Sequence, residues 1–148
     1  MTDISYISML RLLHASEAVE QRISGAISSV HGLALKEVLL LMHLENSPLN
    51  QLPRVELARR LHVSASTVTR MAAPLEKIGL VDRKPDERDA RLAFVVLTRA
   101  GKTKVEEARN TLDQQAARVF QDRWTKAELE QLSGLLLRLL SHESGDLV

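Results

Sequence analysis

The chain has 148 residues, 45% of them hydrophobic and 26% charged, a composition typical of one soluble domain or of one domain with dimer-forming helices. It contains no cysteine, which excludes disulfides, thiolate metal sites and a cysteine redox sensor, and its 3% aromatic content argues against base-stacking platforms. We find no signal-peptide pattern and no apolar run long enough to span a bilayer, so we expect a cytoplasmic protein without membrane contact.

The net charge of +1 is unevenly distributed along the chain. The segment from Arg54 to Lys104 carries 12 basic and 6 acidic side chains, a net charge of +6, whereas the remainder carries −5. A basic middle segment between acidic flanks suits contact with phosphates. Chance clustering of charge is the alternative at this point.

Two helices are predicted before the basic segment. Residues 4–30 have aliphatic side chains at helical spacing, in a stripe wider than one buried face needs, and His31-Gly32 ends this pattern. An apolar stripe at i, i+3, i+4 and i+7 predicts a second helix over residues 35–45.

The next two helices are expected to form a helix-turn-helix. Pro53 suits the first turn of a helix ending near Leu61, because its missing N–H costs nothing there. Ser64 is a suitable N-cap for a helix that runs to Ile78, with Gly79 just beyond its end. Pro74 is expected to kink or loosen this helix.

The faces of the helix over residues 64–78 differ in chemistry. The predicted buried face consists of Val68, Met71, Ala72, Leu75 and Ile78, and the opposite face of Ser66, Thr69, Arg70, Ala73 and Lys77, with Thr67 on the flank. The solvent face is small and rich in hydrogen-bonding groups near the N-terminus, as a helix inserted into a DNA groove needs.

A charged β-hairpin is predicted directly after this helix. Residues 80–83 and 92–97 have the composition of strands, and the tip between them reads Asp86-Glu87-Arg88-Asp89-Ala90-Arg91. A helix-turn-helix followed by such a hairpin is a winged helix, in which one element suits the major groove and the other a neighbouring groove or phosphate.

Two further helices are predicted after the hairpin, capped by Thr98 and Thr125 with a corner at Trp124. The last of them is apolar over more than half of its circumference. Such a surface needs a partner, so we expect the N- and C-terminal helices to form a homodimer interface.

The predicted fold is therefore mainly α with a small β-hairpin wing. We expect a single domain over residues 1–148, with a winged helix-turn-helix lobe at about 33–101. The dimerisation helices are expected at about 4–30 and 102–142.

Five short patterns in this order resemble the MarR family of bacterial transcription regulators over nearly the whole chain. They cover Glu56–Leu61, Ser64–Arg70, Leu75–Arg83, Asp86–Arg91 and Val95–Gly101. The most specific are the wing pattern Asp86-x-Arg88-Asp89-x-Arg91 and the pattern Val95-x-Leu97-Thr98-x-x-Gly101.

The resemblance implies an obligate dimer, triangular in outline, that binds a palindromic operator, usually as a repressor. It also implies release by a small molecule, often phenolic, in a cleft between the dimerisation layer and the DNA lobe. In the wing, Arg88 would enter the minor groove and Asp86 would hold it in position. Pro53, Ala34 and Pro74 depart from the residues that are commoner in the family.

The residues expected to contact DNA come from the helix-turn-helix and the wing. Arg70 can grip guanine bidentately, a contact worth about 1–3 kcal/mol of discrimination. Capping alone would explain Ser64, and without the resemblance Arg88 would be interpreted as a solvated turn residue. The full set is Arg54, Ser64, Ser66, Thr67, Thr69, Arg70, Arg83, Lys84, Asp86 and Arg88, of which Arg54, Arg83 and Lys84 are expected on phosphate.

No catalytic pattern is present, so we expect no enzyme and no cofactor. The histidines lack metal-ligand spacing, so we expect no metal. Placement along the chain suggests an effector cleft lined by Arg11, His14, His31, Met42 and His43.

The expected partners are double-stranded DNA, a second copy of the chain and a small aromatic or phenolic effector. The rival functions are an architectural DNA binder with little sequence preference and a protein-interaction adaptor without an effector.

Overall fold

A computed structural model describes the chain except residues 1, 90–91, 141–144 and 146. Within these limits the helices are α1 (Ile4–His31), α2 (Leu35–Glu45), α3 (Arg54–Leu61), α4 (Ala65–Lys77), α5 (Arg99–Phe120) and α6 (Lys126–Leu137). The strands are β1 (Gln51–Pro53), β2 (Val81–Pro85) and β3 (Ala93–Leu97), and single 3-10 turns span Pro48–Asn50 and Gln121–Arg123. The mainly α fold with a small β wing is confirmed.

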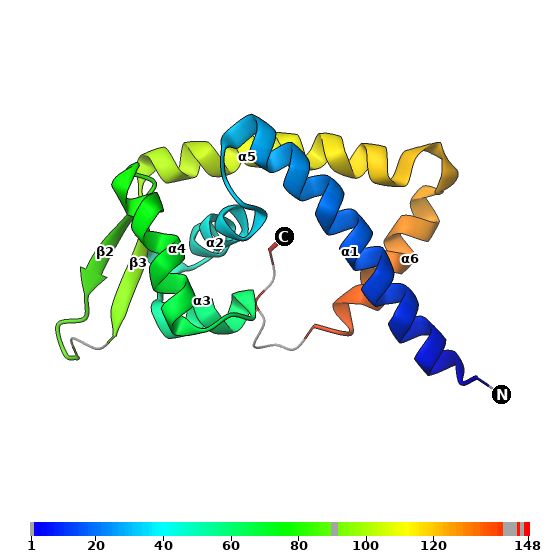
Figure 1. Cartoon of the computed structure of the whole chain (residues 1–148), viewed down its shortest axis with the longest axis horizontal. Coiled ribbons are helices and arrows are strands. Elements are labelled where there is room, and N and C mark those ends of the chain that lie inside the picture. The colour runs from blue at the N-terminus through cyan, green and yellow to red at the C-terminus, as the bar shows by residue number, and fades with distance from the viewer. Residues whose placement is uncertain (1, 90–91, 141–144, 146) are drawn as a thin grey trace.

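Three helices, α1, α5 and α6, extend from one side of a compact lobe. Figure 1 shows α5 along the top, the lobe of α2, α3, α4 and the strands beneath one end of it, and α1 and α6 towards the other end. Helix α1 packs against α5, and α2 packs against both α5 and α3. Taken singly, no helix in the described ranges is long and apolar enough to cross a membrane; α1 and α2 meet that length and composition only as a pair, bent by 82° at their junction.

Local hydrogen bonds fix the starts of three helices where the sequence predicts them. The hydroxyl of Ser64 accepts from the backbone N–H of Thr67 at 3.1 Å. At the start of α5, the Thr98 hydroxyl accepts from the backbone N–H of Gly101 at 3.0 Å. At the start of α6, the Thr125 hydroxyl accepts from the backbone N–H of Glu128 at 3.2 Å. The three predicted caps are therefore confirmed.

Pro53 does not lie in the first turn of α3 as predicted. It holds the N-cap position, with φ −60° and ψ 145°, and is also the last residue of β1. The extended backbone needed for pairing with Phe94 of β3 keeps Pro53 outside the helix. Pro74 lies inside α4, which continues from Ala65 to Lys77 without ending at the proline. The kink or loosened turn expected there stays a prediction.

The wing is the antiparallel pair of β2 and β3, and β1 adds a third strand on the other edge of β3. The register places Val95 opposite Arg83 on one side and opposite Leu52 on the other. The sequence predicts β2 and β3 but not β1. The expected tip residues Ala90 and Arg91 lie outside the described residues, as do the last two residues of the predicted dimerisation segment.

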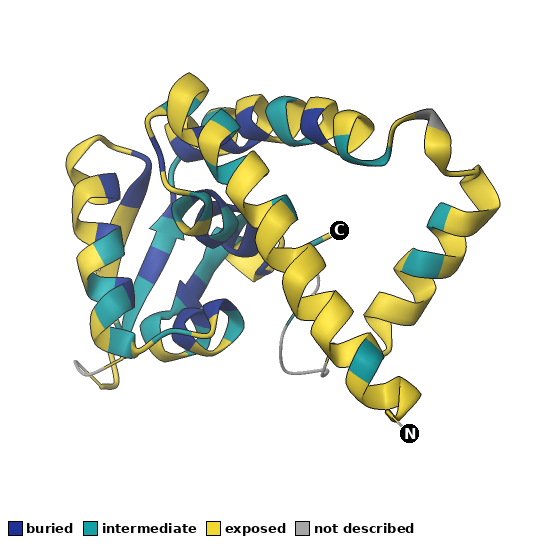
Figure 2. Cartoon of the chain, turned by 45° about the vertical axis from the view of Figure 1, so that its right-hand side comes forward, coloured by how far each residue is buried: buried dark blue, intermediate teal, exposed yellow. Residues whose placement is uncertain are grey.

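The core lies in the lobe, not between the terminal helices. Figure 2 shows buried residues gathered in α2, α3, α4, the strands and the adjoining face of α5, whereas α1 and α6 are largely exposed. Of the predicted buried face of α4, Val68, Ala72 and Leu75 are buried. Ile78 was placed on that face wrongly: it is 61% exposed, because the helix ends at Lys77 and the chain turns away.

Candidate nucleic-acid interface

The N-terminal turn of α4 carries a continuous surface network of hydroxyl groups. The Ser64 hydroxyl lies 3.0 Å from that of Ser66 and 2.8 Å from that of Thr67. Arg70 donates through Nη2 to the Thr67 hydroxyl at 3.2 Å. The capping residue and the arginine predicted to read a base are therefore linked through Thr67 on one exposed surface.

A second, less exposed contact joins α3 to α4. Arg54 donates through Nη1 to the Thr69 hydroxyl at 2.9 Å, and that hydroxyl donates to the carbonyl of Ala65 at 3.2 Å. The Nε of Arg54 is buried and has no hydrogen-bond partner among the described residues. Arg54 is thus turned towards α4, the second helix of the helix-turn-helix, which we call the recognition helix.

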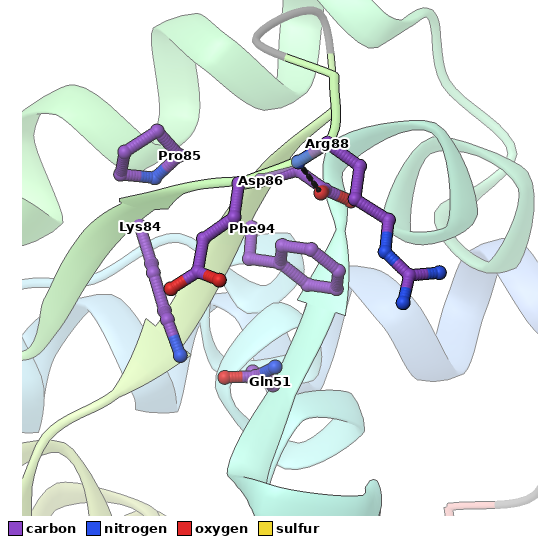
Figure 3. A pocket seen from close by; sticks show the side chains of 7 residues that line it. Gln51, Lys84, Pro85, Asp86, Arg88 and Phe94 are labelled. Atoms are coloured by element: carbon purple, nitrogen blue, oxygen red, sulfur yellow. Dashed lines mark hydrogen bonds between the residues drawn. The ribbon is translucent and has the colours of Figure 1, made fainter.

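Asp86 braces the backbone at the wing. Its carboxylate accepts from the backbone N–H of Arg88 at 2.7 Å, while the Arg88 guanidinium points away from it (Figure 3). A hydrogen bond of this type stabilises the turn without occupying the arginine side chain. Lys84 and Arg88 help to line a shallow pocket of about 400 Å³ together with Gln51 and Phe94.

Arg83 is partly committed to the protein itself. Its guanidinium lies 3.4 Å from the Glu76 carboxylate at the end of α4, with both side chains about half exposed. An ion pair at this exposure is weak and can open when a phosphate approaches. Lys84 is exposed on the same strand.

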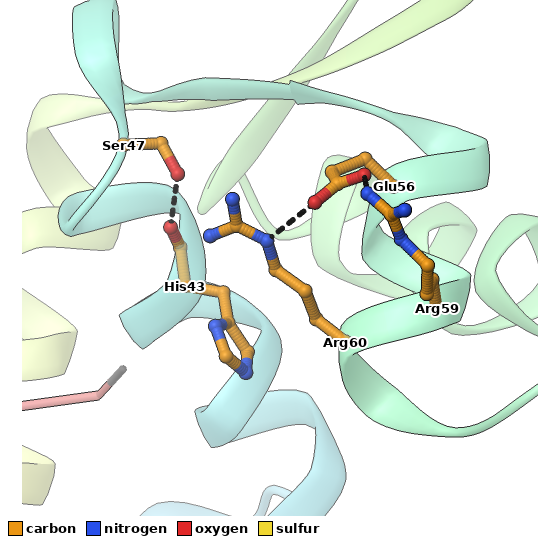
Figure 4. A network of polar contacts seen from close by, with 5 residues as sticks. All are labelled: His43, Ser47, Glu56, Arg59 and Arg60. Atoms are coloured by element: carbon orange, nitrogen blue, oxygen red, sulfur yellow. Dashed lines mark hydrogen bonds and ion pairs between the residues drawn. The ribbon is translucent and has the colours of Figure 1, made fainter. Parts of the chain in front are cut away.

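A polar network of α3 side chains lies beside one buried histidine of α2 (Figure 4). Glu56 accepts from Arg60 Nε at 2.9 Å and also from Arg59, and these hydrogen bonds, that of Arg60 first, lower the pKa of the Glu56 carboxyl. His43 is only 3% exposed, and its Nδ1 has no hydrogen-bond partner within the described chain. Burial, with a smaller contribution from the Arg60 charge, lowers the pKa of His43 to about 4.

His43 also lines a large apolar cavity between the terminal helices and the lobe. The cavity measures about 860 Å³, and its polar groups at the lobe side include His43, Lys36, Arg60 and His62. A volume of this size with apolar walls and few polar groups is typical of small-molecule sites.

The structure does not gather the five residues predicted for the effector cleft around this cavity. Only His43 lines it. Met42 is buried in the core, and His31 Nε2 lies 2.8 Å from the Thr111 hydroxyl. Arg11 and His14 are exposed on α1. Lys36, Arg60 and the apolar wall were missed, because the cavity is built from helices far apart in the sequence.

Metal binding has no visible basis in the described part of the chain, which contains no group of three or more histidine, aspartate or glutamate side chains that could hold an ion.

The geometry combines a helix-turn-helix with a braced hairpin, and this combination defines a winged helix-turn-helix protein.

The sequence matches the MarR family over residues 33–92. The transcriptional regulator AdcR of Streptococcus pneumoniae is 34% identical over 96 residues, which make up 65% of this chain and 63% of AdcR. The aligned part thus spans less than two thirds of that relative. Residues 33–92, which include α2, α3, α4 and β2, thus carry the match to the MarR family.

Solved structures share the fold. Sco3205, a MarR family regulator from Streptomyces coelicolor solved in complex with DNA, has a TM-score of 0.79 at 24% identity, over 94% of this chain and 87% of that one. A probable transcriptional regulator from Pseudomonas aeruginosa has a TM-score of 0.71 at 26% identity, over 93% and 97%. A mutant MarR from E. coli in complex with operator DNA has a TM-score of 0.75 at 23% identity, over 95% and 100%. AdcR, Sco3205 and the Pseudomonas aeruginosa protein are named as transcriptional regulators, not as enzymes.

Proposed function

We propose that the protein is a homodimeric, sequence-specific DNA-binding transcription regulator that represses by occupying a palindromic operator. The proposal rests on the hydroxyl network that links Ser64 to Arg70 at the start of α4, beside a wing whose arginine is braced by Asp86. The DNA complexes of Sco3205 and of the E. coli protein support it at the level of the fold. Binding to chromosomal DNA would place the protein in the cytoplasm.

In this proposal each recognition helix enters a major groove and each wing reaches beside it. Arg70 reads a base edge, the hydroxyls of Ser64, Ser66 and Thr67 contact phosphate or bases, and Arg83 and Lys84 contact phosphate. Arg88 enters the narrow minor groove, where the negative potential favours a guanidinium.

The exposed apolar surface of the terminal helices supports the dimer. Large side chains such as Leu13 of α1 and Leu135 of α6 are more than half exposed in one chain. Pairing of these surfaces between two copies would bury them and would set the distance between recognition helices, which must match a duplex turn of about 34–36 Å.

The apolar cavity is the proposed site of a small aromatic or phenolic effector. Its walls suit a ring, while Arg60 and Lys36 offer polar contacts. A ligand there would alter how the lobe sits against the terminal helices. A coupling of about 1–3 kcal/mol would already change operator affinity by about fivefold or more.

The test is selection of bound duplexes from a random pool, followed by titration of the winner with wild-type protein and the Arg88→Ala variant. We expect the variant to lose about tenfold or more in affinity while its dimerisation and folding stay unchanged. Equal affinity of variant and wild type would remove the wing from the mechanism.

The same titrations separate the rival functions. A regulator must prefer the selected duplex over random duplex at equal salt, whereas an architectural binder would not. Binding through several phosphates must also weaken steeply between low and moderate salt. A protein-interaction adaptor would bind neither duplex.

A further inference from the structure

The bond between Arg54 and Thr69 limits what the recognition helix can read. A hydroxyl has one hydrogen to donate and two lone pairs to accept with. The hydrogen of Thr69 goes to the carbonyl of Ala65 at 3.2 Å, and one lone pair receives Arg54 Nη1 at 2.9 Å. Thr69 therefore has no hydrogen left for the acceptor atoms of guanine or for the O4 of thymine.

Two groups remain on Thr69 for a base: one lone pair and the γ-methyl group. The next residue on that face, one helical turn later, is Ala73, which is exposed and offers a methyl group without any polar atom. In the major groove, an apolar side-chain contact of this kind fits the 5-methyl group of thymine.

We propose that Thr69 is a specificity-determining residue that reads a thymine methyl group beside Ala73, and that Arg54 is the positioning residue that fixes its orientation. The inference rests on the proposed DNA-binding function and names what one part of the recognition helix recognises. It also gives Arg54 a different role from the phosphate contact expected from the sequence.

The partial burial of Arg54, with its Nε enclosed, supports this positioning role. A guanidinium that serves phosphate keeps its donors towards solvent, whereas Arg54 has Nε enclosed and Nη1 committed to α4. Threonine in a helix divides between two side-chain rotamers, because its hydroxyl can bond the preceding turn in one of them. The bond from Arg54 selects one of the two, at a residue that would otherwise present its methyl group only part of the time.

The experiment compares the selected duplex with the same sequence in which deoxyuridine replaces every thymidine, so that only the 5-methyl groups are removed. The measured quantity is the ratio of the two dissociation constants by fluorescence anisotropy at one salt concentration. Removing one buried methyl group costs about fourfold in affinity, so wild-type protein with two recognition helices should show a ratio of about sixteen.

Four variants test whether the Thr69 methyl group, oriented by Arg54, causes the difference in affinity between the two duplexes. Thr69→Ser keeps the hydroxyl and loses the methyl group, so the ratio should fall towards one. Thr69→Val keeps the methyl groups, and its own branching fixes its rotamer in a helix, so the ratio should persist. Arg54→Ala should lower the ratio, and Arg54→Ala combined with Thr69→Val should restore it.

Every outcome bears on the inference. A wild-type ratio near one with tight binding overturns it and leaves the proposed function intact, as does an unchanged ratio in Thr69→Ser. A phosphate contact from Arg54 would instead show in Arg54→Ala as equal weakening of both duplexes, with a salt dependence reduced by about one unit of slope. Failure to select any duplex removes both the inference and the proposed function.

Discussion

The protonation of His43 is coupled to folding because the folded protein buries this imidazole next to Arg60. The pKa of His43 is about 4 in the folded chain, against an ordinary value of 6.5. Between these values the unfolded chain binds more protons at His43, so the contribution of this residue to stability is constant above pH 6.5 and is lost as the pH drops towards 4. The full loss is about 3 kcal/mol, since one pKa unit corresponds to 1.36 kcal/mol.

We therefore expect urea unfolding to show falling stability between pH 7 and pH 5, and the His43→Gln variant to show a much flatter profile. The pKa of Glu56 is also lowered, so its contribution is lost in the same direction, but below the ordinary carboxylate range. Measurements restricted to pH 5–7 separate the contribution of His43 from that of Glu56, and the His43→Gln variant identifies which part of the slope belongs to His43. A variant with the wild-type slope in that window would assign the pH dependence to other groups.

At the scale of elements, α5 begins in close contact with the start of the wing. The Thr98 hydroxyl donates to the carbonyl of Gly79 at 2.6 Å, and the Thr98 N–H donates to that of Leu80 at 3.1 Å. These two hydrogen bonds draw Gly101, in the first turn of α5, against the start of the wing. A Cβ at Gly101 would lie 2.2 Å from the Leu80 carbonyl oxygen and 2.5 Å from Leu97 Cδ1.

Gly101→Ala is therefore expected to destabilise the protein by about 1–3 kcal/mol, because overpacking outweighs the better helix propensity of alanine. Gly25→Ala in α1 is the matched control, since a Cβ there meets nothing within 4 Å. That variant should be neutral or more stable by up to about 1 kcal/mol. Equal midpoints for the two variants in thermal unfolding would contradict the close approach.

The elements whose signals are local were predictable from the sequence. A cap such as Ser64 or Thr98 acts on an N–H three residues away, so its residue type and the periodicity after it suffice. Strand β1 was not predictable, because three residues ending in proline are extended only through pairing with β3, more than 40 residues later. The wing itself was predictable from two segments of strand-like composition around a charged tip.

The residues of the candidate site also fall into two groups, those predictable from local sequence and those placed by tertiary packing. The hydroxyl and arginine face of α4 follows from helical spacing, and Asp86 lies close enough to Arg88 for the pattern to suggest a brace. The direction of Arg54 depends on how α3 packs against α4, and the cavity depends on helices from both ends of the chain. Such tertiary arrangements leave no periodic signal in the sequence, which is why the residues predicted for the cleft omitted Arg60, which lines the cavity, and included Arg11, which does not.

Buried residues are distributed unevenly over the molecule. No residue of α6 is buried, and the first half of α1 is almost entirely exposed. An isolated helix of 12 residues is marginally stable in water, so a partner surface is needed to hold α6 in place. A second copy of the chain would supply that surface with matching leucines.

We expect Leu13→Glu and Leu135→Glu each to convert the proposed dimer into monomer, because an unpaired carboxylate in an apolar interface carries a large desolvation cost. Leu49→Glu is the control: Leu49 is 81% exposed, yet it lies in the lobe outside the terminal helices. Light scattering after gel filtration should give half the wild-type mass for the first two variants and the dimer mass for the third.

The monomeric variants should also bind the selected duplex far more weakly, although no residue proposed to contact DNA has changed. In a dimer the second lobe binds at the effective concentration set by the first, which adds a factor of about 100 or more to the affinity of one lobe. Their helical content should fall by roughly the length of α6, while the lobe still unfolds cooperatively. A monomer that kept the affinity of the dimer would show that one lobe reads the operator alone, and the pairing of the terminal helices would then have no part in recognition.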